Sequence, residues 1–159
     1  MKSRFNLSFS RPAVALALAF LASPLPASAV LGGDLQSVQL DQALMQARLH
    51  SLPVGSYTLH EMSAPTGTIV REYLSSEGKV FAISWRGPAI PNLRQVLGPY
   101  FDRYVAAARA SKAQHRGRGP SLVHAEGLVV QTAGHARAFS GRAYVPAMLP
   151  PGVQTREIQ

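Results

Sequence analysis

The sequence has 159 residues, a formal net charge of +8 and no cysteine. The absence of cysteine excludes disulfide bonds, thiol catalysis and an anchor on a lipid-modified cysteine. The length suits a single domain, because about 130 residues bury around two thirds of their unfolded surface in one core.

The first 29 residues have the pattern of a secretory signal peptide. Three basic residues, Lys2, Arg4 and Arg11, precede an uncharged run over residues 12–22. Ala27-Ser28-Ala29 then offers the small side chains that a signal peptidase accepts. The apolar run is shorter than the roughly 20 residues of a membrane-spanning helix. We therefore expect a signal peptide over residues 1–29, a periplasmic or secreted α+β domain over residues 30–159, and no membrane span after cleavage.

The first predicted element of the mature part is a helix over Leu35–Leu49. Asp34 is the expected N-cap, and Pro53 with Gly55 ends the segment. Three strands are predicted next, because β-branched and aromatic residues gather there between glycine-containing turns. The strands are Ser56–Met62, Thr68–Leu74 and Lys79–Trp85.

The pairing of the last two of these strands predicts which side chains share a face. A two-residue loop at Glu77-Gly78 and a four-residue loop at Ser75–Gly78 give the same faces, because side chains alternate with period two. The acidic member of the core face, Glu72, is expected to pair with an arginine at the sheet edge. The core face is expected to carry Val70, Glu72, Leu74, Phe81, Ile83 and Trp85. The opposite face is expected to carry Ile69, Arg71, Tyr73, Val80, Ala82 and Ser84.

A second helix is predicted from Leu93 to Ala108, where apolar residues recur at helical spacing in one continuous stripe. Asn92 is the expected N-cap. Pro99, after Gly98, predicts a kink because proline lacks the N–H group that a helix interior requires. The stripe stays in phase across the proline, so both halves are expected on the same sheet.

A basic, glycine-containing loop is predicted over Ser111–Pro120. A hairpin follows, with strands Leu128–Ala133 and Ala136–Tyr144 and a turn at Gly134-His135. Prolines beyond this hairpin predict an irregular C-terminal tail. The order of elements indicates an α+β fold, a two-layer sandwich in which two helices pack on an antiparallel sheet of about five strands, a three-strand meander plus the C-terminal hairpin.

Several blocks of the mature chain resemble one exported bacterial family. They are GTIVREY, GKVFAISW, NLRQVLGPYFDRYV, HRGRGP and GLVVQTAGHARAFSGRAYVP. In this order they resemble the family of domain of unknown function twenty-eight forty-four. The resemblance implies a small proteobacterial envelope protein with a signal peptide. It brings no established activity and no catalytic residues.

The sequence contains no recognisable catalytic or metal-binding pattern. The five histidines are scattered, and His60-Glu61 lacks the second histidine of a zinc-protease helix. Ser140-Gly141 has Ala138 where a nucleophile elbow needs glycine. We therefore expect no metal and no cofactor, and a non-catalytic role is favoured. A small hydrolase of envelope polymers acting through Glu61 and Glu72 stays open as an alternative.

A few residues are candidates for ligand contacts. Trp85 ends its strand beside Arg86-Gly87, where an indole can stack on a sugar or a peptide, and Arg71 and Tyr73 lie on the face opposite the predicted core. The basic loop would present three positive charges to phosphate or carboxylate, those of Lys112, Arg116 and Arg118. The expected partner is an anionic envelope ligand or another envelope protein and not nucleic acid, with a purely structural role in an envelope complex as a further alternative.

Overall fold

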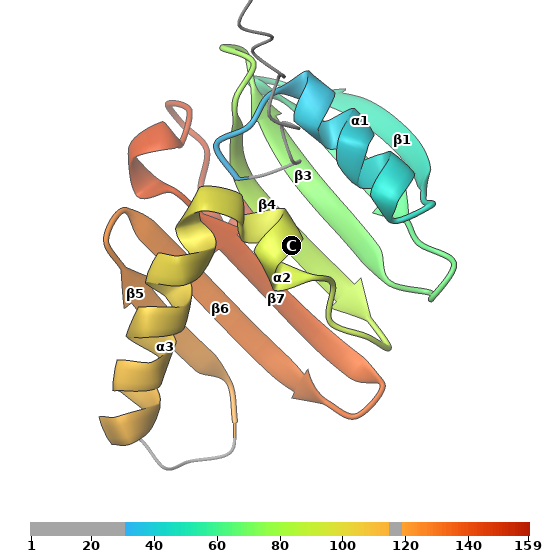
Figure 1. The fold of residues 1–159 in the computed structure, drawn as a ribbon. Helices are drawn as coiled ribbons and strands as arrows, with labels where there is room; N and C mark the ends of the chain where they lie inside the picture. The colour runs from blue at the N-terminus through green and yellow to red at the C-terminus, as the bar shows by residue number, and fades with distance from the viewer. Residues whose placement is uncertain (1–30, 115–118) are drawn as a thin grey trace, which may run out of the picture.

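One open sheet of seven antiparallel strands organises the chain, and the α-helices of the described residues cover one of its faces (Figure 1). The computed structural model describes residues 31–114 and 119–159, so the predicted signal peptide and two of the loop residues, Arg116 and Arg118, lie outside the described part. Across the sheet the strands are β1 (Arg48–Val54), β2 (Tyr57–Ser63), β3 (Ile69–Ser75), β4 (Val80–Gly87), β7 (Ala138–Tyr144), β6 (Leu128–His135) and β5 (Ser121–Ala125).

The predicted α+β class and antiparallel sheet are confirmed, but the predicted count of about five strands is too low. The two missed strands, β1 and β5, are the two edges of the sheet. Most of their side chains are exposed, so neither shows the apolar alternation of a half-buried strand. β1 also contains Pro53, which a sheet tolerates at an edge because proline cannot donate to the ladder.

The first helix, α1, spans Leu35–Leu44 and is shorter than predicted. Its N-cap is Asp34, as expected, and the side chain of Asp34 accepts a hydrogen bond of 3.1 Å from the backbone N–H of Ser37. The chain leaves the helix through Gln46, which has a positive φ of 49°. The predicted helical residue Leu49 therefore belongs to β1.

A β-bulge between β3 and β4 corrects the predicted faces. Tyr73 pairs with Ala82 but Leu74 pairs with Val80, so Phe81 is an extra residue without a partner in β3. The bulge turns Phe81 to the face opposite the helices and places Val80 in the core beneath them. The predicted faces of these two residues are wrong for this reason, whereas Val70, Ile83 and Trp85 lie in the core as expected.

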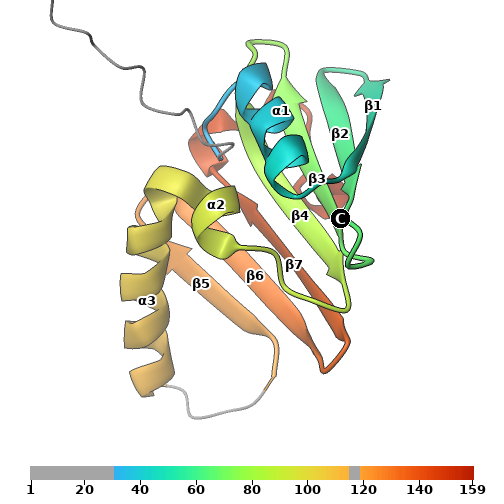
Figure 2. The same ribbon diagram turned by 45° about the vertical axis from the view of Figure 1, so that its right-hand side comes forward.

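The second predicted helix is broken into two at the expected place. α2 (Leu93–Leu97) begins at its predicted N-cap, Asn92, and a short 3-10 turn, η1 (Gly98–Tyr100), separates it from α3 (Phe101–Gln114). Figures 1 and 2 show α1 near β3 and α3 beside β5 on the same side of the sheet. The helix runs through Ser111–Gln114, so the predicted loop begins later than expected.

The last hairpin also differs from the prediction, because β6 continues through Gly134 and His135. The turn lies at Ala136-Arg137, where Arg137 has a positive φ of 67°. Gly134 serves the close approach of the two strands rather than the turn. A Cβ atom there would lie 2.1 Å from the carbonyl oxygen of Ala138.

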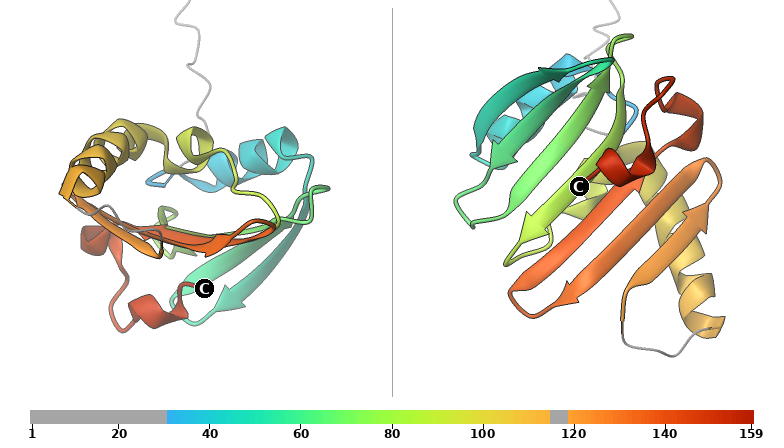
Figure 3. Two further views of the ribbon diagram at one scale, coloured as in Figure 1. Left: turned by 90° about the horizontal axis from the view of Figure 1, so that it is seen from below. Right: turned by 180° about the vertical axis from the view of Figure 1, so that it is seen from behind.

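The face of the sheet away from the α-helices, here called the back face, is partly covered by the segment after β7. This segment contains two 3-10 turns, η2 (Pro146–Met148) and η3 (Thr155–Glu157), and lies across the back of the strands in both views of Figure 3. Ile158 is 1% exposed. It packs in a back-face cluster with Tyr57, Tyr73, Phe81 and Ala82.

The back-face cluster predicts a stabilising role for the C-terminal segment. The change Ile158→Ala should lower the free energy of unfolding by about 2–4 kcal/mol, because it removes a buried side chain and leaves a cavity. The control Leu44→Ala, at a position that is 64% exposed, should change it by less than about 0.5 kcal/mol. Urea melts measure both values. A loss below about 1 kcal/mol for Ile158→Ala would contradict the packing described for this segment.

Candidate ligand-binding groove

A groove with a volume of about 570 Å³ lies on the back face across β4, β7, β6 and β5. The strands form its floor, and the C-terminal residues Ile158 and Gln159 form a wall. The lining side chains come from residues that alternate along three neighbouring strands, so the antiparallel register brings them together. They include Arg86, Ser140, Arg142 and Gln131.

Arg142 fixes the geometry of the groove wall. Its Nη1 group donates hydrogen bonds to the carbonyl oxygens of Thr155 at 2.6 Å and Ile158 at 3.3 Å. Its Nε group donates to the side-chain oxygen of Gln131 at 2.5 Å. One side chain of β7 therefore fastens the C-terminal segment and orders a neighbouring residue of β6.

The side chains that line the groove include two arginines, Arg86 and Arg142. Arg86 is exposed, and its side chain forms no hydrogen bond or ion pair within the part of the chain that the structure describes. On the adjacent strand its register partner is Ser140, and Arg142 lies two residues further along β7. None of the described lining residues is acidic. Guanidinium and hydroxyl donors in this arrangement favour a carboxylate or a phosphate.

The same groove has an apolar part. Leu122 of β5 is 48% exposed and lies in the lining with Pro120, Ala133 and Ile158. An apolar side chain that stays exposed on a sheet face can gain free energy by burial against a ligand, at roughly 25 cal/mol per Å². The groove thus joins a cationic end at Arg86 to an apolar surface at Leu122.

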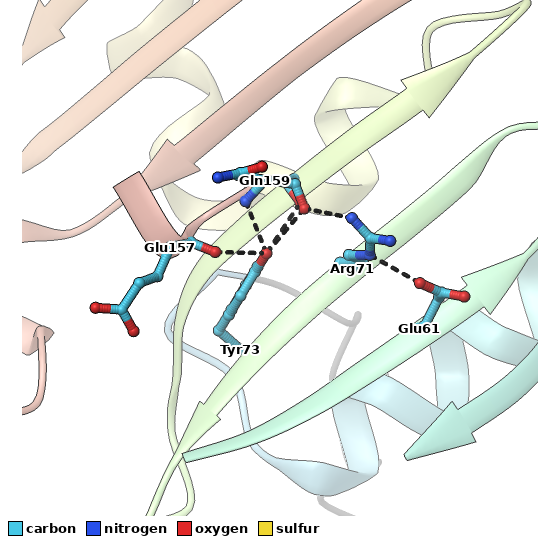
Figure 4. A network of polar contacts seen from close by, with 6 residues as sticks. Glu61, Arg71, Tyr73, Glu157 and Gln159 are labelled. Atoms are coloured by element: carbon cyan, nitrogen blue, oxygen red, sulfur yellow. Dashed lines mark hydrogen bonds and ion pairs between the residues drawn. The ribbon is translucent and has the colours of Figure 1, made fainter. Parts of the chain in front are cut away.

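Two of the predicted ligand contacts, Arg71 and Tyr73, bind the chain's own C-terminal segment (Figure 4). Arg71 donates from Nε to the carboxylate of Glu61 at 2.8 Å and from Nη1 to the carbonyl oxygen of Gln159 at 2.7 Å. The Tyr73 hydroxyl accepts from the backbone N–H of Gln159 at 2.9 Å and donates to its carbonyl oxygen at 3.0 Å. These donors hold the groove wall in place.

The other predicted contacts are separated from one another. Trp85 is 3% exposed and packs in the core under the helices, and it also borders the groove beside Gly141, where a Cβ atom would lie 2.2 Å from the indole ring. Lys112 is exposed in the last turn of α3, on the helical side of the sheet. Arg86 and Arg142 were not predicted. Arg142 could have been found from the sequence, because it is two residues from Ser140 in the last hairpin and the two side chains therefore lie on the same face of the sheet.

The carboxylate alternative fails on geometry. Glu61 lies on the back face with Arg71, whereas Glu72 is fully buried on the helical face, so the two acids cannot act on one bond. Glu72 also lacks the predicted arginine partner, since neither of its oxygens receives a hydrogen bond from a donor in the described residues. The Ser51 hydroxyl lies 2.8 Å from Nδ1 of His60, but Nε2 of this histidine has no partner there, so no serine–histidine–acid relay is assembled.

Two other kinds of feature are absent from the described residues. They contain no group of three or more histidine, cysteine or acidic side chains placed to hold a metal ion. None of their helices has the length and apolar character needed to cross a bilayer.

The chain was compared with curated proteins, solved structures and family models. No curated protein and no solved structure matches the chain. One family model matches residues 27–158, which includes nearly all of the predicted mature part and the five blocks on which the resemblance rests. The chain belongs to this family, which is described as protein of unknown function (DUF2844).

Proposed function

We propose that this chain is an exported, non-catalytic binding protein of the bacterial envelope that holds an amphipathic anion in the back-face groove. The observation that carries the proposal is that one groove is lined both by the Arg86 guanidinium, which has no partner among the described residues, and by the exposed apolar side chain of Leu122. A ligand with a carboxylate or phosphate at one end and an apolar body matches both features.

The arginines of the groove supply complementary parts of this recognition. Arg86 offers all five of its N–H groups, while Arg142 uses Nε and Nη1 within the chain and has N–H groups left over. A hydrogen bond to a charged group contributes about 1.5–3 kcal/mol, and less where water screens it. Arg86 is exposed, so we expect its contribution near the lower end of that range.

Cleavage after Ala29 is compatible with the first contacts of the described chain. Leu31 is fully buried, and its backbone N–H donates to the carbonyl of Val96 at 3.2 Å. Gly32 donates to the carbonyl of Val80 at 2.8 Å. Cleavage after Ala29 would therefore remove none of these interactions and would leave a single residue, Val30, ahead of the packed chain.

Ligand binding is tested with the mature chain and a dansyl-labelled long-chain fatty acid, with its neutral methyl ester as the uncharged probe. The acid should bind more tightly than the ester, and Arg86→Ala should weaken acid binding about tenfold, which corresponds to about 1.4 kcal/mol. The control Arg109→Ala removes an equal charge from an exposed position of α3 that does not line the groove, and it should leave the affinity unchanged.

Salt provides an independent check on the same titration. Because the contact is electrostatic and exposed, affinity for the acid should fall as the Debye length shortens from about 10 Å at 0.1 M salt to about 3 Å at 1 M. Equal binding of acid and ester, or equal losses in the two arginine variants, would contradict the proposed site.

Export predicts a defined mature N-terminus. When the full-length chain is expressed in a Gram-negative host, the periplasmic fraction should contain a protein that begins at Val30. The reason is the small-residue site Ala27-Ser28-Ala29 after a short apolar run. Intact-mass spectrometry of the fraction decides the point. A full-length mass recovered from the membrane pellet would show that the first 29 residues are not a cleaved leader.

A further inference from the structure

Two carboxyl groups meet in the core between α1 and the sheet. Asp41 of α1 and Glu72 of β3 are both fully buried, and their side chains are hydrogen-bonded to each other. Asp41 also accepts a hydrogen bond from the side-chain amide of Gln95 in α2. Apart from Asp41, no described residue donates a hydrogen bond to either oxygen of Glu72. The two acids thus join α1, the sheet and α2 at one point.

Among the described residues, none places a positive charge against this pair. On the sheet, Glu72 lies between His60 of β2 and Ile83 of β4. His60 is the other titratable group beside the pair, and burial lowers its pKa, which keeps the imidazole neutral. No lysine or arginine of the described residues forms an ion pair with either acid. A buried carboxylate in such a place is strongly disfavoured.

A hydrogen bond between two carboxyl groups requires a proton on one of them, because ionised carboxylates only accept. Burial raises the pKa of Glu72 well above its ordinary value, and the neighbouring Asp41 raises it further. Burial also raises the pKa of Asp41, although the hydrogen bonds from Glu72 and Gln95 oppose this effect. The pair is therefore held by one shared proton.

We propose that Asp41 and Glu72 form a proton-operated latch, in which one shared proton holds α1 on the sheet and its loss releases the helix. The pair matters for the position of α1 because this helix buries few apolar side chains against the sheet. Among its residues only Ser37, Val38 and Asp41 are buried, and one of these is apolar. Its leucines, Leu35, Leu40 and Leu44, are exposed. When the shared proton is lost, a second negative charge appears beneath α1. Only a small apolar contact then remains to hold the helix on the sheet.

The direction of the pH effect follows from proton linkage. The released acid regains its ordinary pKa, so opening discharges a proton and becomes more favourable as pH rises. The effect begins near the ordinary pKa of glutamate, about 4.3, and ends at the raised pKa of the pair. Within that window, opening should increase by up to tenfold per pH unit. Burial lowers the pKa of His60, so this residue favours opening as pH falls, which is the opposite direction. Above its ordinary pKa of about 6.5 it makes no contribution to the pH dependence.

The absence of cysteine allows a direct measurement of opening. Val38→Cys places a single thiol at a fully buried position of α1, and Gln36→Cys places one at an exposed position of the same helix. Both proteins are labelled with a methanethiosulfonate reagent from about pH 5 to about pH 9. The ratio of the two rates cancels the titration of the thiol and reports how often α1 leaves the sheet.

The latch predicts that this ratio rises at least tenfold across the range, and that the rise is much smaller when Glu72→Gln leaves Asp41 as the one titrating acid of the pair. The same comparison in Glu72→Met serves if the glutamine variant does not fold. A constant ratio in the background that retains Glu72 overturns the proposal. An equal rise with the neutral residues also overturns it, because release of α1 would then not depend on this acid.

Discussion

The back of the sheet depends on three side chains, Arg71, Tyr73 and Arg142, that fasten the C-terminal segment to it. The α-helices cover only one face of the seven strands, so the opposite face would expose Phe81 and its aromatic neighbours. Hydrogen bonds to the backbone of Thr155, Ile158 and Gln159 hold the segment where Ile158 can bury that cluster. The same segment forms the wall of the groove. The packing of the back face and the shape of the groove therefore depend on one set of contacts.

The β-bulge at Phe81 explains why the back face needs this cover. One extra residue in β4 turns a large aromatic side chain away from the helical core, where strict alternation would have placed it. Its ring lies 5.7 Å from that of Tyr57 and 6.0 Å from that of Tyr73, distances typical of aromatic pairs. The bulge thus creates a second small core, and the C-terminal segment completes it.

The parts of the fold that local chemistry determines could be predicted from the sequence. The helix caps Asp34 and Asn92 and the break at Gly98-Pro99 are of this kind. The edge strands could not be predicted, because β1 and β5 lack apolar alternation and are defined by pairing to their neighbours.

The groove could not be predicted from the sequence for a similar reason. Arg86 and Arg142 are 56 residues apart in the sequence and meet only through the β4–β7 register. The pairing of Asp41 with Glu72 is equally non-local, since it joins a helix to a strand.

The central claim is that the back-face groove receives the anionic end of an amphipathic ligand at Arg86. Nuclear magnetic resonance of the mature chain, labelled with nitrogen-15 and titrated with a long-chain fatty acid, tests this most directly. The account predicts that the side-chain Nε–H resonance of Arg86 and the backbone amides of Leu122, Gln131 and Ser140 shift together, while those of α3 do not. Shifts confined to the helical face around Lys112, or no shifts at saturating ligand, would contradict it.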